Sequence, residues 1–225
     1  MAAGRVPTMG HVSEPRFRVA HGLRLKGFAQ PCVVAEIAAL DEPEVTSHLH
    51  HLEDLGHARH REGRITGWSL TGDGRKLHHE SCAAELAASG AEPIVRAGYE
   101  RFLDFNGALL QACTDWQVRS DAPAGAQVLN VHDDAAYDRA VIARLGDIDS
   151  GIQPVIVELA GALDRFSAYG RRLADALARV EAGDTDWFTG AMVESYHTVW
   201  FELHEDLLVT LSIERAAEHS GGGAG

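Results

Sequence analysis

Apolar residues recur at helical spacing in the first part of the chain. Val19 and Leu23 lie on one face of a short predicted helix, and a second helical segment follows it. A third segment places Val45, Leu49 and Leu52 at the i, i+4 and i+7 positions, which fall on one side of a helix. Three consecutive helices are therefore expected at the start of the fold.

The period of the pattern changes to two beyond Gly56. Residues 59–62 and 65–70 alternate around Gly63, which predicts two short strands of a ribbon. Residues 71–75 form a predicted turn, after which the helical pattern resumes. The expected order is three helices, a two-stranded ribbon and a further helix.

The remainder of the chain has a helical pattern with short interruptions. We expect helices at about 74–88, 92–118, 134–148, 152–181 and 190–217. The longest irregular connection is expected at residues 119–132. Helices joined by short loops are typical of a helical bundle.

The order of helices, turn and ribbon is that of a winged helix-turn-helix. Residues 45–57 (VTSHLHHLEDLGH) and 59–75 (RHREGRITGWSLTGDGR) resemble the recognition helix and wing of MarR-type bacterial transcriptional regulators. The resemblance covers about a quarter to a third of the chain and implies a DNA-binding regulator. The predicted fold class is mainly α: an N-terminal winged helix-turn-helix with a two-stranded wing, followed by a C-terminal helical bundle.

The distribution of charge supports a division into two modules. Residues 1–80 hold ten basic and ten acidic side chains, so the whole net charge of −13 arises from residues 81–225. Nine of the thirteen histidines lie in the first part, where partial protonation would add positive charge. We therefore expect a flexible tail (1–14), a winged-helix DNA-binding domain (15–80), an acidic helical bundle for dimerisation, effector binding or both (81–219) and a disordered tail (220–225).

The predicted DNA-binding face follows from the buried face of the third helix. With its apolar side inward, hydroxyl and imidazole groups point outward, where they can donate to base edges and phosphates in a major groove. Arginines in or beside the wing tip can reach phosphates or a minor groove. The predicted DNA-binding residues are Thr46, Ser47, His50, His51, Arg59, Arg61 and Arg64.

One alternative remains open for this face. It carries no Arg or Lys, and the acidic Glu53 and Asp54 lie close to it. Winged helices also serve as docking modules for other proteins, so the same surface could bind protein instead of DNA. If it does bind DNA, the affinity is expected to depend on the wing arginines and, through the histidines, on pH.

The last helical segment carries a candidate ligand pocket. His197 and His204 lie on an otherwise apolar stripe, and Trp200 flanks it. Such histidines either hydrogen-bond to buried partners or line a cavity, and the sequence is compatible with both interpretations. The candidate ligand-binding residues are Trp116, Tyr196, His197, Trp200 and His204.

The chain lacks the common signatures of catalysis and cofactor binding. It has no G-x-S-x-G, no phosphate-binding glycine loop and no dinucleotide fingerprint, so we predict no catalytic residue and no cofactor. His78 and Cys82 have the i, i+4 spacing of helical metal ligands, but a single thiol–imidazole pair is a weak signal. His197 and His204 would lie about 10 Å apart along a helix, which does not suit one ion. We predict no metal site.

The apolar runs and the cysteine content predict a cytoplasmic protein without a membrane-spanning segment. No apolar run approaches the ~20 residues that span a bilayer, and the first residues do not resemble a secretory signal. Three cysteines at long spacing make no disulfide framework, which favours a reducing compartment.

A second resemblance concerns residues 186–208. This segment is similar to actinobacterial proteins found near, or fused to, phosphoenolpyruvate-utilising phosphotransferases. Those enzymes carry a phosphorylated histidine after Gly-Gly and Ser or Thr, whereas His132 follows Asn130 and Val131 here. The resemblance therefore implies a functional neighbourhood and no phosphotransfer chemistry.

The sequence as a whole favours a one-component transcriptional regulator. Its expected partners are double-stranded DNA, a small-molecule effector and a second copy of the chain in a homodimer. Two alternatives are an interaction module that regulates a neighbouring phosphotransfer enzyme, and a small-molecule-binding protein or enzyme that uses a cavity at His197 and His204.

Overall fold

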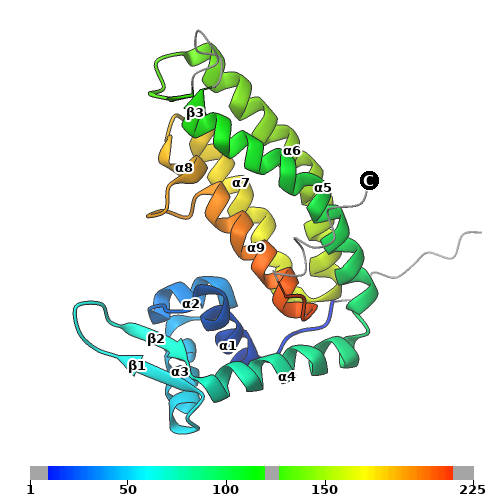
Figure 1. Ribbon diagram of the computed structural model, residues 1–225. Helices are drawn as coiled ribbons and strands as arrows, with labels where there is room; N and C mark the ends of the chain where they lie inside the picture. The colour runs from blue at the N-terminus through cyan, green and yellow to red at the C-terminus, as the bar shows by residue number, and fades with distance from the viewer. Residues whose placement is uncertain (1–9, 120–126, 215–225) are drawn as a thin grey trace, which may run out of the picture. The chain divides into compact units, whose positions relative to one another are not determined.

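The computed structural model describes residues 10–119 and 127–214 and is mainly helical with a small two-stranded antiparallel sheet, β1 (Ala58–Arg61) and β2 (Gly67–Leu70), as predicted (Figure 1). A second antiparallel pair, β3 (Val118–Arg119) and β4 (Val128–Leu129), was not predicted. The expected tail at 220–225, most of the tail at 1–14 and the centre of the connection at 119–132 lie outside these ranges. The chain forms two compact units. Unit 1 comprises Met1–Arg96, Leu159–Ala168 and Glu205–Gly225, and unit 2 comprises Ala97–Glu158 and Tyr169–His204.

Unit 1 begins with three short helices, a β-ribbon and a longer helix. These elements are α1 (Pro15–Lys26), α2 (Pro31–Ala38), α3 (Glu42–Asp54), β1 (Ala58–Arg61), β2 (Gly67–Leu70) and α4 (Gly72–Ser89). A proline in the first turn favours each of the first three helices, because its missing N–H has no partner to lose there. The Asp41 side chain caps α3 by accepting from the backbone N–H of Glu44 at 2.8 Å. The expected boundary between residues 80 and 81 lies within α4.

The ribbon is antiparallel, and a further segment pairs with it. Ala58 lies opposite Leu70, and Arg61 lies opposite Gly67. On its other side, Trp68 exchanges two backbone hydrogen bonds with Ala29, of 2.7 and 3.0 Å. Gly67 suits this close approach, because a Cβ there would lie 2.8 Å from the carbonyl oxygen of Ala29.

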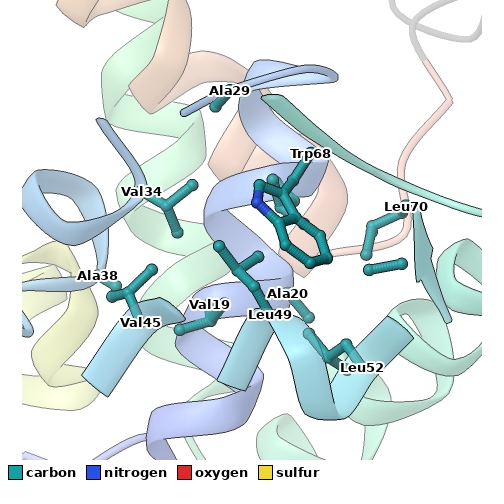
Figure 2. Close-up of a cluster of buried hydrophobic side chains, with 12 residues drawn as sticks. Val19, Ala20, Ala29, Val34, Ala38, Val45, Leu49, Leu52, Trp68 and Leu70 are labelled. Atoms are coloured by element: carbon teal, nitrogen blue, oxygen red, sulfur yellow. The ribbon is translucent and has the colours of Figure 1, made fainter. Parts of the chain in front are cut away.

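One hydrophobic core holds the first helices and the ribbon together (Figure 2). The prediction that Val45, Leu49 and Leu52 point inward is confirmed, since each is at most 2% exposed. In α2 the sequence pattern predicts that Val33, Ile37 and Leu40 share the inward face, but Val34 is fully buried and Val33 only partly. The cluster comprises Val19, Ala20, Leu23, Ala29, Val34, Ala38, Val45, Leu49, Leu52, Ala58, Trp68 and Leu70.

The helical remainder of the chain differs from the prediction at three places, one of which is the predicted helix at 152–181, interrupted at residues 163–166. Its elements are α5 (Glu92–Gln117), β3 (Val118–Arg119), β4 (Val128–Leu129), α6 (Ala135–Ala162), η2 (Asp164–Phe166), α7 (Ser167–Glu181), α8 (Asp186–Thr189) and α9 (Tyr196–Thr210). The predicted helix from 190 to 217 is wrong, because residues 190–195 are not helical. The predicted break at 149–151 is also wrong, since α6 continues through it and through Pro154.

Tertiary packing explains why α6 continues there. Gly151 leaves room for the Phe105 ring, which would lie 2.4 Å from an added Cβ. Asp149 accepts hydrogen bonds from the Tyr196 hydroxyl at 3.2 Å and from the Gln153 amide at 3.0 Å. These contacts outweigh the helix-breaking tendency of Gly and Pro in this segment.

Unit 2 is held together by contacts between its long helices. Arg172 of α7 is buried and binds the carboxylates of Glu194 and Glu202 at 2.6 and 2.7 Å. Arg144 of α6 pairs with Asp115 of α5 at 2.7 Å. None of the described helices is long and apolar enough to cross a membrane.

Candidate nucleic-acid interface

The outward face of α3 carries the predicted polar residues. Because the opposite face is locked into the core, Ser47, His50 and His51 are exposed. Thr46 is partly buried, and its hydroxyl donates to the carbonyl oxygen of Glu42 at 2.8 Å. Of the four residues predicted on this face, one hydroxyl and two imidazoles are therefore exposed.

Glu53, an acidic residue that weakens the prediction of DNA binding, is turned toward the ribbon. Its Oε1 accepts from the backbone N–H of His60 in β1 at 3.1 Å, and its Oε2 lies 3.7 Å from Nδ1 of His50. The carboxylate is thus engaged by α3 and β1, whereas Asp54 remains exposed at the end of the helix. Of the two acidic residues near the outward face of α3, one is therefore already bound within the protein.

Trp68 connects α3 to the ribbon. Its ring is 3% exposed and meets His60 at 4.7 Å between centroids. His50 packs edge-on against the same ring at 5.1 Å, with its side chain 62% exposed. A histidine of α3 and a histidine of β1 are consequently fixed by one buried aromatic side chain, so helix and ribbon form one surface.

Sequence reasoning missed a basic residue at this surface. Arg16, in the first turn of α1, lies with Nη1 3.1 Å from Nε2 of His51. Because a guanidinium only donates, Nε2 of His51 is the acceptor and Nδ1 carries the proton. The two residues are 35 positions apart, and no periodicity within either helix signals the contact.

The three predicted wing arginines are all exposed. Arg59 and Arg61 are alternate residues of β1, and Arg64 lies in the connection to β2. With Phe28 and Ile65, Arg61 and Arg64 line a hollow beneath the connection. The ribbon therefore presents positive charge at the surface of unit 1, in contrast to the buried arginines of the chain, which are held by carboxylates.

Four of the five candidate ligand residues of unit 2 fall into two groups. Tyr196 donates to Asp149, and the Trp200 indole donates to Asn106 at 3.0 Å and stacks on Phe102 at 4.6 Å. His204 also meets the Phe102 ring, at 5.0 Å. The structure thus brings Trp200 and His204 together around Phe102.

Trp116 belongs to a different cluster of the same unit. Its ring stacks on Phe188 at 4.7 Å and meets His132 at 4.4 Å. His132 in turn lies 3.1 Å from the Asp138 carboxylate. Sequence spacing could not separate the two clusters, because it does not report which faces of different helices meet.

Burial shifts the pKa values of two of the candidate ligand residues, Tyr196 and His197. Burial, followed by the charge of Asp149, raises the pKa of Tyr196 well above its ordinary value. His197 is partly buried at the start of α9, and burial lowers its pKa. These two side chains are therefore neutral at pH 7.

Comparison of the chain with protein-family models, with curated proteins and with solved structures gave no match. The function is therefore inferred from the geometry of the chain's own residues.

Proposed function

We propose that the protein is a cytoplasmic one-component transcriptional regulator whose unit 1 is a MarR-like winged helix-turn-helix. In this proposal α3 is the recognition helix, β1 and β2 are the wing, and double-stranded DNA is the partner. The observation that supports it best is the continuous surface of α3 and β1. This surface presents Ser47, His50 and His51 beside exposed arginines, while the Glu53 carboxylate is held by β1.

In a complex with DNA, α3 and the wing would contact different parts of the duplex. The hydroxyl and imidazoles of α3 would read base edges in the major groove, where each good contact discriminates among bases. Arg59, Arg61 and Arg64 would contact phosphates or enter the adjacent minor groove. Arg16, held against His51, would add a phosphate contact at the start of α1.

The helical part would supply the response to a signal. A C-terminal helical bundle would form a homodimer, since paired recognition helices need two half-sites about one helical turn apart. A small-molecule effector would act only by binding one arrangement of the dimer better than another. Of the candidate residues, His197 and His204 are partly exposed and are proposed to contact the effector, whereas Trp116, Tyr196 and Trp200 are buried. Light scattering of the full chain tests the dimer.

The direct test is a salt series on promoter DNA from upstream of the chain's own gene. Log affinity is expected to fall linearly with log salt concentration, with a slope set by the number of phosphates that the protein neutralises. Replacing Arg59, Arg61 and Arg64 together by Ala should weaken binding and reduce the slope by about 0.9 for each phosphate that is no longer neutralised.

A matched control removes the same charge elsewhere. Arg96, Arg171 and Arg179 are also exposed, and replacing these three by Ala changes the net charge equally. The control variant should retain both affinity and salt slope. Absence of DNA binding by the wild-type chain at low salt would contradict the proposal and favour a protein-docking role for the same surface.

A further inference from the structure

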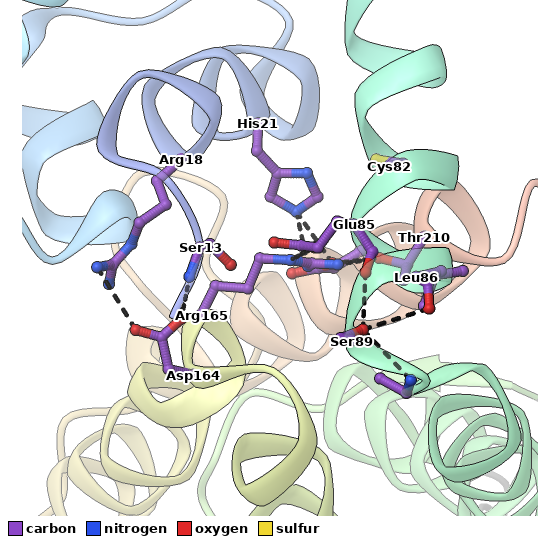
Figure 3. Close-up of polar contacts among 12 residues, drawn as sticks. Ser13, Arg18, His21, Cys82, Glu85, Leu86, Ser89, Asp164, Arg165 and Thr210 are labelled. Atoms are coloured by element: carbon purple, nitrogen blue, oxygen red, sulfur yellow. Dashed lines mark hydrogen bonds and ion pairs between the residues drawn. The ribbon is translucent and has the colours of Figure 1, made fainter. Parts of the chain in front are cut away.

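A buried polar cluster lies inside unit 1 (Figure 3). Its centre is Arg165 of η2, which is 5% exposed. The guanidinium donates to Glu85 Oε2 at 3.1 Å, to Thr210 Oγ1 at 2.6 Å and to the Asp206 carboxylate. Burial would lower the pKa of Arg165, but Asp206 and Glu85 raise it, so the side chain stays charged.

Asp206 also orients a histidine. Nε2 of His21, on α1, lies 3.0 Å from Asp206 Oδ1. Burial would raise the pKa of Asp206, but the charge of Arg165 and the hydrogen bonds from His21 and Arg165 hold it below the ordinary value, so the carboxylate accepts. Nε2 of His21 also lies 3.1 Å from Nη1 of Arg165, a group that can only donate and that is bonded to the same Asp206 carboxylate. With its proton on Nε2 and directed to Asp206, His21 has its lone pair on Nδ1, pointing away from Asp206.

Two further donor atoms lie where that lone pair points. Nδ1 of His21 is 2.9 Å from Nε2 of His78, which is itself 3.6 Å from Sγ of Cys82. All three ligand atoms lie within 4.8 Å of one another, and the three residues are at most 3% exposed. His78 and Cys82 are one turn apart on α4, and α1 supplies His21 from 57 positions earlier.

We propose that His21, His78 and Cys82 bind a thiophilic divalent transition-metal ion of the Zn²⁺ class. Two imidazoles and a thiolate are a donor set that such ions prefer. The His21–Asp206 contact is the carboxylate–histidine arrangement that fixes ligand histidines in metal sites. Metal binding at this site does not depend on the proposed DNA binding.

Two of the three ligand separations are close to those around a tetrahedral ion, and the third, from His21 Nδ1 to Cys82 Sγ, is at most 4.8 Å. Metal–nitrogen bonds of about 2.0–2.1 Å and a metal–sulfur bond of about 2.3 Å place ligand atoms roughly 3.4–3.6 Å apart. The separation of His78 and Cys82 matches this, and that of His21 and His78 must widen by about half an ångström. The fourth position is left for water.

The charge of the cluster also favours an ion. Arg165 with Glu85 and Asp206 carries a net charge of −1 inside the protein, and one oxygen of Glu85 is buried without a hydrogen bond among the described residues. A divalent ion bound to a Cys82 thiolate carries +1, which neutralises the cluster. Binding would release the thiol proton to solvent.

Of the three proposed ligands, His78 is in a protonation state that suits coordination and lines an open pocket. Burial lowers the pKa of His78 to about 2, so its ring is neutral and can coordinate. Without metal, burial raises the pKa of Cys82 to about 12, so the ion itself must displace the proton. His78, together with Arg24, Arg75 and Glu205, lines an open pocket of about 420 Å³ that provides an entry path.

The test is a titration of the metal-free full chain with Co²⁺, followed by Zn²⁺. We expect a 1:1 complex with thiolate-to-cobalt charge-transfer absorption and the visible bands of tetrahedral Co²⁺, both removed by Zn²⁺. Cys82→Ser and His78→Gln should abolish the thiolate band or weaken binding at least tenfold. Cys113→Ser and His79→Gln, which change a second buried thiol and the neighbouring imidazole, should leave the complex unchanged.

A second measurement needs no variant. X-ray absorption of the Zn²⁺-loaded wild-type chain should show one sulfur at about 2.3 Å and nitrogens at about 2.0–2.1 Å. Absence of a thiolate band with Co²⁺ in the wild type, its survival in a folded Cys82→Ser variant, or a zinc shell without sulfur would each overturn the proposal.

Discussion

At the residue scale, Gly74 shows how one missing side chain determines a local structure. It lies in the first turn of α4, where a Cβ would be 1.8 Å from the carbonyl oxygen of His57. The backbone N–H of Gly74 donates to the Thr71 hydroxyl at 3.0 Å, and that hydroxyl donates to the carbonyl oxygen of Gly56 at 2.7 Å. The start of α4 is therefore locked against the turn that precedes β1.

Gly74→Ala is expected to destabilise the protein by about 3 kcal/mol or more, because backbone must move to admit the methyl group. Gly72→Ala is the matched control, since nothing lies within 4 Å of its added Cβ. That variant should be neutral or more stable by up to about 1 kcal/mol. Chemical denaturation measures both, and equal stability of the two variants would contradict the steric argument.

At the element scale, the spacing of apolar residues predicts those structural features that depend on a single segment of the chain. The inward face of α3 and the existence of the β1–β2 ribbon follow from spacing within about a dozen residues. The continuation of α6 depends on Phe105, and the contact of Arg16 with His51 depends on how α1 packs on α3. Such contacts join segments that are distant in the sequence, so the residue pattern within one segment cannot predict them.

The same limit explains what can be predicted of the two candidate sites. The exposed residues of α3 are identified from the side opposite to the apolar stripe, and the wing arginines from their place around Gly63. His78 and Cys82 have helical spacing that the sequence shows, but His21, the third ligand, comes from another helix. A metal site whose ligands come from two helices cannot be predicted from the spacing of residues within one helix.

A prediction at this scale concerns the start of α9. Burial lowers the pKa of His197 in the folded protein, so between that value and about 6.5 the unfolded chain binds more protons. The stabilisation is complete above about pH 6.5 and is lost as the pH falls toward the folded pKa. The wild type should therefore lose more unfolding free energy than His197→Gln between pH 8 and pH 5.

The difference should stay below the roughly 1.4 kcal/mol per pH unit that one fully linked proton would give, because the ring is only partly buried. Urea unfolding at the two pH values measures it. Identical losses in the wild type and the variant would show that His197 titrates alike in the folded and unfolded chains.

At the scale of the whole molecule, unit 1 is built from three stretches of the chain. The first holds the helices and ribbon, the second supplies Arg165, and the third supplies Asp206 and Thr210. His21 and Arg165, which meet at 3.1 Å, are 144 positions apart. A single range of residues cannot include segments that join a unit from distant parts of the chain, so residues 15–80 contain His21 but omit Arg165, Asp206 and Thr210.

Arg165 is the residue on which this assembly depends most. Arg165→Ala would leave Glu85 and Asp206 buried without their cation, and breaking a buried pair in this way costs about 3–5 kcal/mol. Arg171→Ala removes the same charge from an exposed pair with Asp175 and should cost less than about 0.5 kcal/mol. The loss in Arg165→Ala should shrink toward acidic pH, because unpaired buried carboxylates take up protons. Unfolding free energies of both variants at neutral and acidic pH measure these effects, and a cost for Arg165→Ala as small as that for Arg171→Ala would refute the assigned role.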